Sequence, residues 1–396
     1  MKALIKNILF VAVAVASCFL TACKDEDNGS ANTPVVRYVR SCDSAKSDSL
    51  ITKASLGSTI AIIGENLGDV KEIWFNDQQA KVNPVYVTDK SILVAIPSGI
   101  PTDVTGKIRF VTQSGLESTY DFGVVVPSPV LNSMKCEYVA DGDTAVIEGD
   151  FFLNPKVYFK GNMEAQIVSF TKTELKVIVP SDAEAGPVTV ESMYGSTRSI
   201  FNFRDNSVVS PSTKLFNDFE ETSSWNPWGL SAFGSEDGLS GQYLKFEGTT
   251  GSWAWPANSL QLYYASSTRT PLVSSGDIST LALRFEANCK EWHDTPLLFW
   301  FTNNAGTHNV DGDDPQAHWK PYLKSGVKSN YVTDGWETIT IPLSDFKYDK
   351  AETGGVTRSI TSLSQLVDLH AMFFGAADGT YNLKLWIDNM RIVKYK

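Results

Sequence analysis

Residues 57–67 read GSTIAIIGENL, and residues 142–152 read GDTAVIEGDFF. Each stretch begins with a glycine, continues through a short apolar run and reaches a second glycine at its eighth position. The second copy begins 85 residues after the first (142 minus 57). Short apolar runs between glycines are typical of β-strands that pack one face on a core. The repeat therefore predicts two successive all-β domains.

Two further motifs repeat at nearly the same offset. Residues 74–76 (WFN) correspond to 158–160 (YFK), and residues 94–97 (VAIP) correspond to 177–180 (VIVP). Glycine allows the positive-φ turns that join short strands, and proline ends strands at sheet edges. Each copy is thus predicted to be a β-sandwich.

Together these motifs resemble the IPT/TIG immunoglobulin-like domain. The resemblance covers residues 34–126 and residues 127–205, although the second copy has Phe151 and Phe152 in place of the usual Asn-Leu. Domains of this family usually act as spacers or interaction modules, so the resemblance implies such a role for both copies. Trp74 lies in a predicted strand and is expected to be partly buried.

A third region, residues 206–396, follows the polar segment NSVVSPS at 206–212. Its strand patterns continue to the C-terminus, with clear alternation in WETITIPL (336–343) and LKLWIDNMRI (383–392). No amphipathic helix of useful length is predicted. This pattern predicts a jelly-roll β-sandwich. The predicted fold class is therefore all-β, with two immunoglobulin-like sandwiches followed by a jelly roll.

Tryptophan is concentrated in the third region, where nine of the ten lie after residue 220. Four are in loop-like sequence, SSWNPWG (223–229) and TGSWAWPAN (250–258). Aromatic faces are costly to leave in water unless a ligand stacks on them, and a sugar ring has an apolar face with polar edges. The stretches 288–294 and 316–322 also combine a tryptophan with polar side chains.

Seven residues are predicted to form a glycan-binding surface: Trp228, Trp253, Trp255, Trp292, His318, Trp319 and Tyr322. Trp292 and Trp319 are the best candidates for stacking platforms, although core packing is the alternative for every tryptophan. Trp300, Trp336 and Trp386 lie within strand-like runs, so they are predicted to pack in the core or against the sheets.

The strand motifs of the third region, together with FNDFE at 216–220, resemble the carbohydrate-binding jelly rolls. With the tandem IPT/TIG repeats, the whole chain is similar to surface glycan-binding lipoproteins of Bacteroidota polysaccharide utilisation loci. The resemblance implies a non-catalytic receptor. Such a receptor would capture polysaccharide and pass it to surface glycanases and an outer-membrane importer.

Residues 1–22 are predicted to be a signal peptide, because two lysines accompany an apolar run too short to span a membrane. The run ends in LTAC (20–23), which resembles the bacterial lipoprotein signal and implies that Cys23 is lipidated. Residues 23–33 would then form a tether. The acidic KDED at 24–27 resembles the export signal of Bacteroidota lipoproteins. The predicted location is the outer membrane, lipid-anchored and exposed at the cell surface.

A structural Ca²⁺ is a candidate at Asp218, Glu220 and Asp388, which lie near the first and last strands of the third region. Jelly-roll binding modules often tie such strands with a buried Ca²⁺, and carboxylate oxygens suit that ion. The alternative is that these carboxylates never meet. The acidic loop at 309–320 fails the EF-hand pattern, and the histidines lack zinc-site spacing.

Composition excludes other classes of partner. The net charge is −11 and no basic stripe is present, which argues against nucleic acid. Hydrophobic residues make up 42% and charged residues 20%, as in ordinary globular proteins. Cys42, Cys136 and Cys289 are far apart in the sequence, so no disulfide scaffold is predicted.

Two other functions are alternatives to the glycan receptor. A glycoside hydrolase or lyase on a jelly roll would need two carboxylates about 5–9.5 Å apart across a cleft. Candidate acids such as Glu286, Glu291 and Glu337 lie in no recognised catalytic motif. A surface adhesin that binds host proteins through the immunoglobulin-like domains is the other alternative.

Overall fold

The computed structural model describes residues 32–45, 49–205, 216–220, 225–229, 231–236, 239, 241–253, 260–264, 271–302, 314–349 and 354–396. In these segments the regular elements are β-strands and short 3₁₀ turns, without an α-helix, so the predicted all-β fold class is confirmed. No helix within these ranges is long and apolar enough to cross a membrane. The chain divides between Val126 and Pro127 into two compact units.

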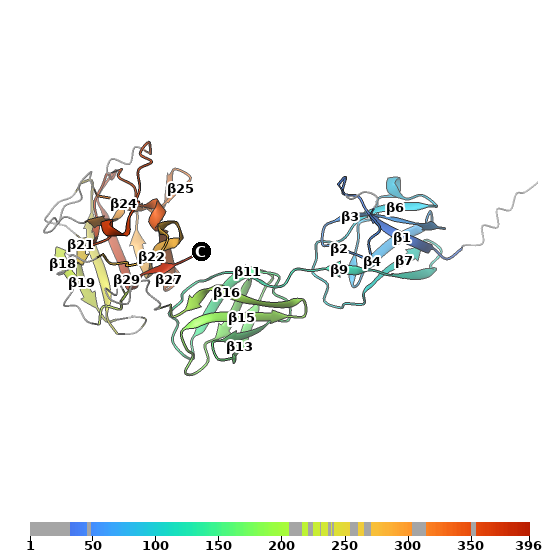
Figure 1. The fold of residues 1–396 in the computed structure, drawn as a ribbon, viewed down its shortest axis with the longest axis horizontal. Helices are drawn as coiled ribbons and strands as arrows, with labels where there is room; N and C mark the ends of the chain where they lie inside the picture. Colours follow the sequence, from blue (N-terminus) through green and yellow to red (C-terminus); the bar gives the residue numbers. More distant parts are fainter. Residues whose placement is uncertain are drawn as a thin grey trace, which may run out of the picture. The chain divides into compact units, whose positions relative to one another are not determined.

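The first unit is a β-sandwich with an apolar interior (Figure 1). One sheet has the order β1-β3-β6, another has the order β5-β4-β7-β8, and β2 pairs in parallel with β9. The core includes Ile62, Ile73, Phe110 and Phe122, all at most 2% exposed. The strands are β1 (Val35–Ser41), β2 (Lys53–Ser55), β3 (Thr59–Glu65), β4 (Val70–Phe75), β5 (Gln78–Gln79), β6 (Ser91–Ala95), β7 (Lys107–Thr112), β8 (Glu117–Asp121) and β9 (Gly123–Val125).

The second unit begins with a sandwich whose strands follow the order β10-β11-β14-β13-β12-β15-β16. Its own apolar core includes Ile147, Val177, Val190 and Phe203. The strands are β10 (Val130–Met134), β11 (Thr144–Asp150), β12 (Lys156–Phe159), β13 (Met163–Phe170), β14 (Glu174–Ile178), β15 (Gly186–Ser192) and β16 (Gly195–Phe203).

The repeated second glycine has a structural cause. A Cβ atom at Gly64 would lie 2.0 Å from the carbonyl oxygen of Val35, and one at Gly149 would lie 1.9 Å from that of Val130. In both sandwiches the first strand thus lies so close to the strand it pairs with, β3 or β11, that no side chain fits at the glycine. Glycine is required there because the backbone of a neighbouring strand occupies the Cβ position.

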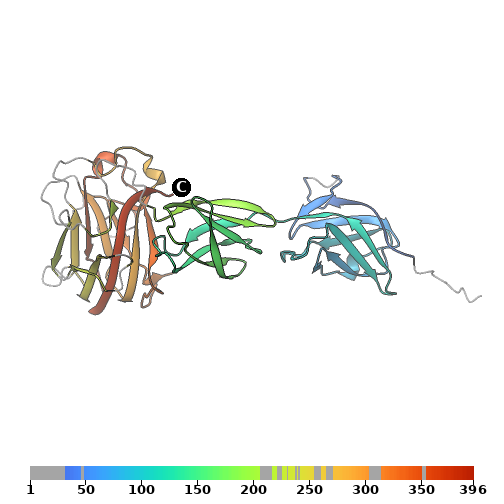
Figure 2. The same cartoon turned by 90° about the horizontal axis from the view of Figure 1, so that it is seen from below.

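The rest of the second unit is a sandwich of two sheets (Figures 1 and 2). One sheet has the order β19-β20-β29-β22-β27 with β17 beside β29, and the other has the order β18-β21-β28-β23-β24. Their facing side chains form one large core that includes Phe285, Phe299, Leu369 and Leu385. The strands are β17 (Phe216–Asn217), β18 (Trp225–Gly229), β19 (Ser231–Gly234), β20 (Tyr243–Thr250), β21 (Leu260–Tyr264), β22 (Leu281–Trp292), β23 (Leu297–Thr302), β24 (Gln316–Trp319), β27 (Glu337–Pro342), β28 (Asp368–Phe373) and β29 (Tyr381–Lys394). A small hairpin, β25 (Leu323–Lys324) and β26 (Val327–Lys328), lies off these sheets.

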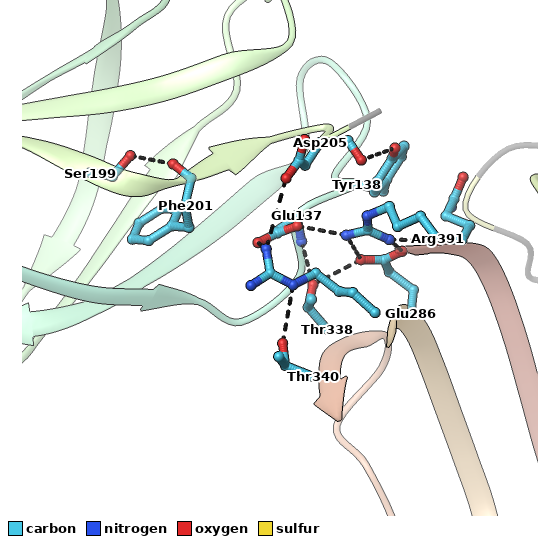
Figure 3. Close-up of polar contacts among 11 residues, drawn as sticks. Glu137, Tyr138, Ser199, Phe201, Asp205, Glu286, Thr338, Thr340 and Arg391 are labelled. Carbon is cyan, nitrogen blue, oxygen red and sulfur yellow. Dashed lines mark hydrogen bonds and ion pairs between the residues drawn. The ribbon is translucent and has the colours of Figure 1, made fainter. Parts of the chain in front are cut away.

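A buried ionic cluster joins the two sandwiches of the second unit (Figure 3). Arg391 in β29 donates to Glu137 at 2.6 Å and to Glu286 at 2.8 Å, and Arg284 in β22 donates to the other oxygen of Glu137 at 2.9 Å. All four side chains are at most 9% exposed. The backbone N–H of Glu137 also donates to Thr338 Oγ1 at 2.8 Å. Asp205 Oδ2, also buried, lies 4.0 Å from Arg284, so two cations and three carboxylates meet where the two sandwiches join.

Candidate functional site

The five-stranded sheet of the C-terminal sandwich has two faces with different partners. Alternate side chains of β23, namely Leu297, Phe299 and Phe301, enter the core between the two sheets. The intervening Leu298 and Trp300 form a separate small cluster with Met372 of β28. Because strand side chains alternate, this second set lies on the sheet face opposite the large core. We call this surface the outer face.

Aromatic and polar side chains alternate across the outer face. Trp300 pairs in register with His370 of β28 and with Gln316 of β24, and Leu298 pairs with Met372 and with His318. The rings of Trp300 and His370 are stacked, with centroids 4.8 Å apart and planes 28° apart. The indole Nε1 of Trp300 has no hydrogen-bond partner in the part of the chain that the structure describes. The outer face therefore combines rings with hydrogen-bonding groups, although Trp300, His370 and Gln316 are at most 2% exposed.

A cavity of about 270 Å³ lies beside Leu298 and His318 of the outer face. Trp253 contributes to its wall and is 51% exposed. Its ring packs edge-on against Phe374 with centroids 5.1 Å apart, and its backbone N–H donates to the carbonyl of Gly375 at 2.7 Å. An exposed indole is thus held in a defined orientation at the mouth of a cavity.

Charged groups of the same cavity are tied together. Lys328 Nζ lies 2.5 Å from the buried Asp294 Oδ2 and 3.1 Å from Asp378 Oδ2. The hydrogen bonds to Asp294 and Asp378 raise the pKa of Lys328, so the ammonium group stays charged at neutral pH. The backbone N–H of Asp378 also donates to Asp294 Oδ2 at 3.0 Å. These contacts fix donors and acceptors beside Trp253, an arrangement suited to orienting a polar ligand that has an apolar face.

Three of the seven predicted binding residues line this cavity: Trp253, His318 and Tyr322. Tyr322 is only 2% exposed. Trp228 belongs to β18, where it pairs in register with Gln261 of β21, but its side chain is outside the described part of the structure. Trp255 lies outside the described residues altogether.

The choice of Trp292 as a stacking platform is wrong. Its side chain is fully buried in the core between the sheets, and Nε1 donates to the carbonyl oxygens of Asp294 at 3.1 Å and Thr295 at 3.0 Å. Trp319 packs edge-on against it with centroids 5.1 Å apart. The alternation of β24 directs Trp319 to the core side and His318 to the outer face, so the partly buried Trp319 packs against the core and does not lie on the outer face.

Trp300 packs against a sheet, as its strand-like run predicts. It is buried on the outer face beside His370 and not in the core between the sheets. The run LLFWFT is apolar on both faces, so period-two alternation in the sequence does not tell which face Trp300 occupies. Its position becomes evident only once Phe299 and Phe301 are known to lie in the core.

The predicted calcium ligands are partly brought together. Burial raises the pKa of Asp388 to about 8, and the negative charges of Glu286, Asp218 and Glu220 act in the same direction. The buried Oδ2 of Asp388 has no hydrogen-bond partner in the described segments. No group of three or more His, Cys, Asp or Glu side chains in those segments is arranged to hold a metal ion. The side chains as placed do not form a calcium site, and calcium binding stays a prediction.

The three cysteines in the described part of the chain are unpaired. Cys42 is exposed, whereas Cys136 and Cys289 are buried, and burial raises the pKa of the Cys289 thiol to about 12. Burial also raises the pKa of Cys136, so the two buried thiols are protonated at neutral pH. They contribute no charged group to the outer face.

Comparison with known proteins shows what this chain resembles. Residues 209–394 match the family model described as "Surface glycan-binding protein B xyloglucan binding domain". The crystal structure of the surface glycan-binding protein PbSGBP-B from Prevotella bryantii is similar over 92% of this chain and 99% of that one, with 28% identity and a TM-score of 0.74. The predicted resemblance to surface glycan-binding proteins is thus confirmed, and the chain is similar to proteins of the SGBP-B type.

A second relative matches over a shorter stretch. An "IPT/TIG domain-containing protein" of Bacteroides ovatus is 31% identical over 154 residues, which are 37% of this chain and 31% of that protein. The matching stretch therefore spans about a third of the length of that curated relative. Its printed name agrees with the predicted immunoglobulin-like repeats.

Proposed function

We propose that this protein is a non-catalytic, cell-surface receptor for polysaccharide, and that its ligand is xyloglucan or a closely related glycan. The observation that carries the proposal is the cavity beside the outer face, where the half-exposed Trp253 stands over fixed polar groups within the region that matches a xyloglucan-binding family. Stacking of a sugar ring on such an indole contributes on the order of 1 kcal/mol or more.

Binding without catalysis is supported by the state of the acidic residues. Glu286, one of the candidate acids, is fully buried and bonded to Arg391 and Thr338, so it is occupied within the ionic cluster. Asp294 at the cavity is likewise bonded to Lys328. A glycosidase needs an acid and a second carboxylate facing each other across the substrate.

The location and partners follow from the sequence. The lipoprotein-like signal ending at Cys23 favours an outer-membrane lipid anchor, with the immunoglobulin-like domains between the anchor and the glycan-binding domain. Several acyl chains make such an anchor effectively permanent. A receptor of this kind would act beside surface glycanases and an importer that take up the captured glycan.

Affinity gel electrophoresis tests the proposal. The full mature chain should be retarded in gels that contain xyloglucan, and a panel with mixed-linkage β-glucan, mannan and pectin defines the selectivity. No release of reducing sugar is expected over the same period. Equal mobility in every gel would overturn the proposal, and release of reducing ends would favour the hydrolase alternative. Blank gels together with binding to host proteins would favour the adhesin.

A further inference from the structure

A groove of about 480 Å³ lies where the second immunoglobulin-like domain meets the C-terminal sandwich. Both domains contribute to its lining, which includes Lys135, Asp143, Thr144 and Lys176 on one side and Asp334 and Trp336 on the other. The groove is separate from the outer face, because Trp336 directly precedes β27 of the opposite, six-stranded sheet.

Trp336 is a half-buried residue at the edge of an aromatic cluster. Its ring lies edge-on to Tyr243 with centroids 5.8 Å apart and tilted to Trp386 at 6.4 Å, while Tyr243 and Trp386 are 5.1 Å apart. Lys290 Nζ lies 5.1 Å from the centroid of Trp386. These contacts fix the orientation of the Trp336 ring. An aromatic ring held in this way binds a flat ligand at little cost in side-chain entropy.

Buried polar atoms with no partner lie on the same sheet face. Asn288 pairs in register with Trp386, so the two side chains share a face. Asn288 is 3% exposed, and neither its Oδ1 nor the Nε1 of Trp386 has a hydrogen-bond partner among the described residues. One is an acceptor and the other is a donor. Buried polar groups normally have partners, and neither residue lines the groove, so this pair points to water beneath the aromatic cluster.

The groove is preformed because hydrogen bonds fix the second immunoglobulin-like domain against the C-terminal sandwich. We call this contact region the joint. Lys135 Nζ donates to the carbonyl oxygen of Asp334 at 2.8 Å and to its carboxylate at 3.1 Å, and the backbone N–H of Thr338 donates to the carbonyl of Lys135 at 2.7 Å. The cluster of Arg391, Glu137, Glu286 and Arg284 holds the same joint (Figure 3). The volume of the groove falls within the range of about 300–1,000 Å³ that small-molecule sites occupy.

We propose that this groove is a second glycan-binding site, in which Trp336 is the stacking ring. The inference rests on the proposed function, because it assigns the same class of ligand to a second surface. The lining suits a sugar: one fixed indole is flanked by side chains of both charges, and hydroxyl groups can donate to Asp143 and Asp334 and accept from Lys176. One polysaccharide chain bound at two sites on one protein would be held more tightly than at either site alone.

The test counts sites on the full mature chain by calorimetric titration with a short xylogluco-oligosaccharide. Wild type should bind two oligosaccharides per chain. Trp336→Ala and Thr144→Arg should each bind one, and retardation by long xyloglucan should weaken about tenfold or more. Thr144 is exposed and makes its strand contacts through the backbone, so arginine there fills the groove without disturbing the core. Trp74→Ala, which removes a half-buried indole of the first unit, is the matched control and should bind two.

Each outcome decides between the two proposals. If wild type binds one oligosaccharide and Thr144→Arg also binds one with unchanged affinity, the groove is not a glycan site and the proposed receptor function stands. If Trp336→Ala fails to fold, the result for Thr144→Arg decides alone. If wild type binds no glycan of the panel, both proposals are wrong. If another protein binds in the groove and the chain binds only one oligosaccharide, the second glycan-binding site is also overturned.

Discussion

At the scale of single residues, tryptophans of this protein differ in role according to their hydrogen bonds and exposure. Trp292 is enclosed by core side chains and donates Nε1 to backbone carbonyls, so its loss would leave a cavity and orphaned carbonyls. Trp253 is half exposed and contacts the fold mainly along one edge of its ring. Its loss removes an exposed ring surface and leaves the packing of the core unchanged.

Substitution of each by alanine separates stability from binding. Trp253→Ala is expected to weaken glycan binding about tenfold, equivalent to about 1.4 kcal/mol, with little change in unfolding. Trp292→Ala is expected to lower the free energy of unfolding by roughly 3–5 kcal/mol. Urea denaturation and affinity gels measure the two quantities. A folded Trp292→Ala protein of normal stability with weakened binding would contradict the assignment of Trp292 to the core.

Asp388 links stability to pH. Its pKa in the folded protein, about 8, lies above that of an ordinary aspartate, about 3.9, so between these values the folded state retains a proton that the unfolded state releases. The stabilisation is fully present below about pH 4 and is lost as the pH rises towards 8.

Asp388→Asn keeps the shape of the protonated acid. We expect this variant to be more stable than wild type at pH 8, on the order of a few kcal/mol, and similar to wild type near pH 4. Thermal unfolding of both proteins at both pH values, with chelator present, measures this difference in stability. A variant that is less stable than wild type at pH 8, together with stabilisation of wild type by added calcium, would contradict this account and favour the predicted calcium site.

At the scale of strands, the joint within the second unit depends on one loop residue. Glu137 follows β10 and bridges Arg284 of β22 and Arg391 of β29. Burial raises the pKa of Glu286, which lies beside Glu137 in the cluster, although Arg391 and Arg284 act in the opposite direction. Charged side chains are tolerable out of water only while each is paired.

Glu137→Gln is therefore expected to destabilise the second unit by roughly 3–5 kcal/mol, because it removes the buried carboxylate that pairs with both Arg284 and Arg391 and leaves Arg284 with Asp205, 4.0 Å away, as its counter-charge. Glu191→Gln, at an exposed position of β15 in the same domain, is the control and should change stability by less than about 0.5 kcal/mol. Denaturant titrations of both variants give the comparison. Equal midpoints would show that the ionic cluster does not hold the joint.

Strand patterns predicted more of this molecule than loop patterns did. The repeated GxxxxxxG motif predicted two β-sandwiches, and the close approach of Val35 and Val130 to Gly64 and Gly149 explains why the motif repeats. The pairing of Glu137 with Arg391 could not be predicted, because 254 residues separate them and strand patterns do not show which distant residues meet. The face occupied by each tryptophan depends on register, which tertiary packing decides.

At the scale of the whole molecule, the candidate glycan sites lie in the second unit, and the first unit holds a separate apolar core. The sequence before residue 34 supplies the proposed anchor. Function in the cell would then require both binding and retention at the membrane.

Retention is expected to depend on Cys23. Cys23→Ser should abolish incorporation of labelled fatty acid and move the protein out of the membrane fraction, while the purified variant still binds glycan. Fractionation of cells with fatty-acid labelling measures this. A Cys23→Ser protein that stays labelled and membrane-bound would show that the anchor lies elsewhere.

The central claim is that the C-terminal sandwich binds glycan at the cavity beside its outer face. A crystal structure of the full mature chain with a xylogluco-oligosaccharide tests it most directly. We predict a sugar ring stacked on Trp253, with hydroxyl groups within hydrogen-bond distance of His318 or Lys328. An oligosaccharide bound only to the immunoglobulin-like domains, with the cavity at Trp253 empty, would contradict the claim.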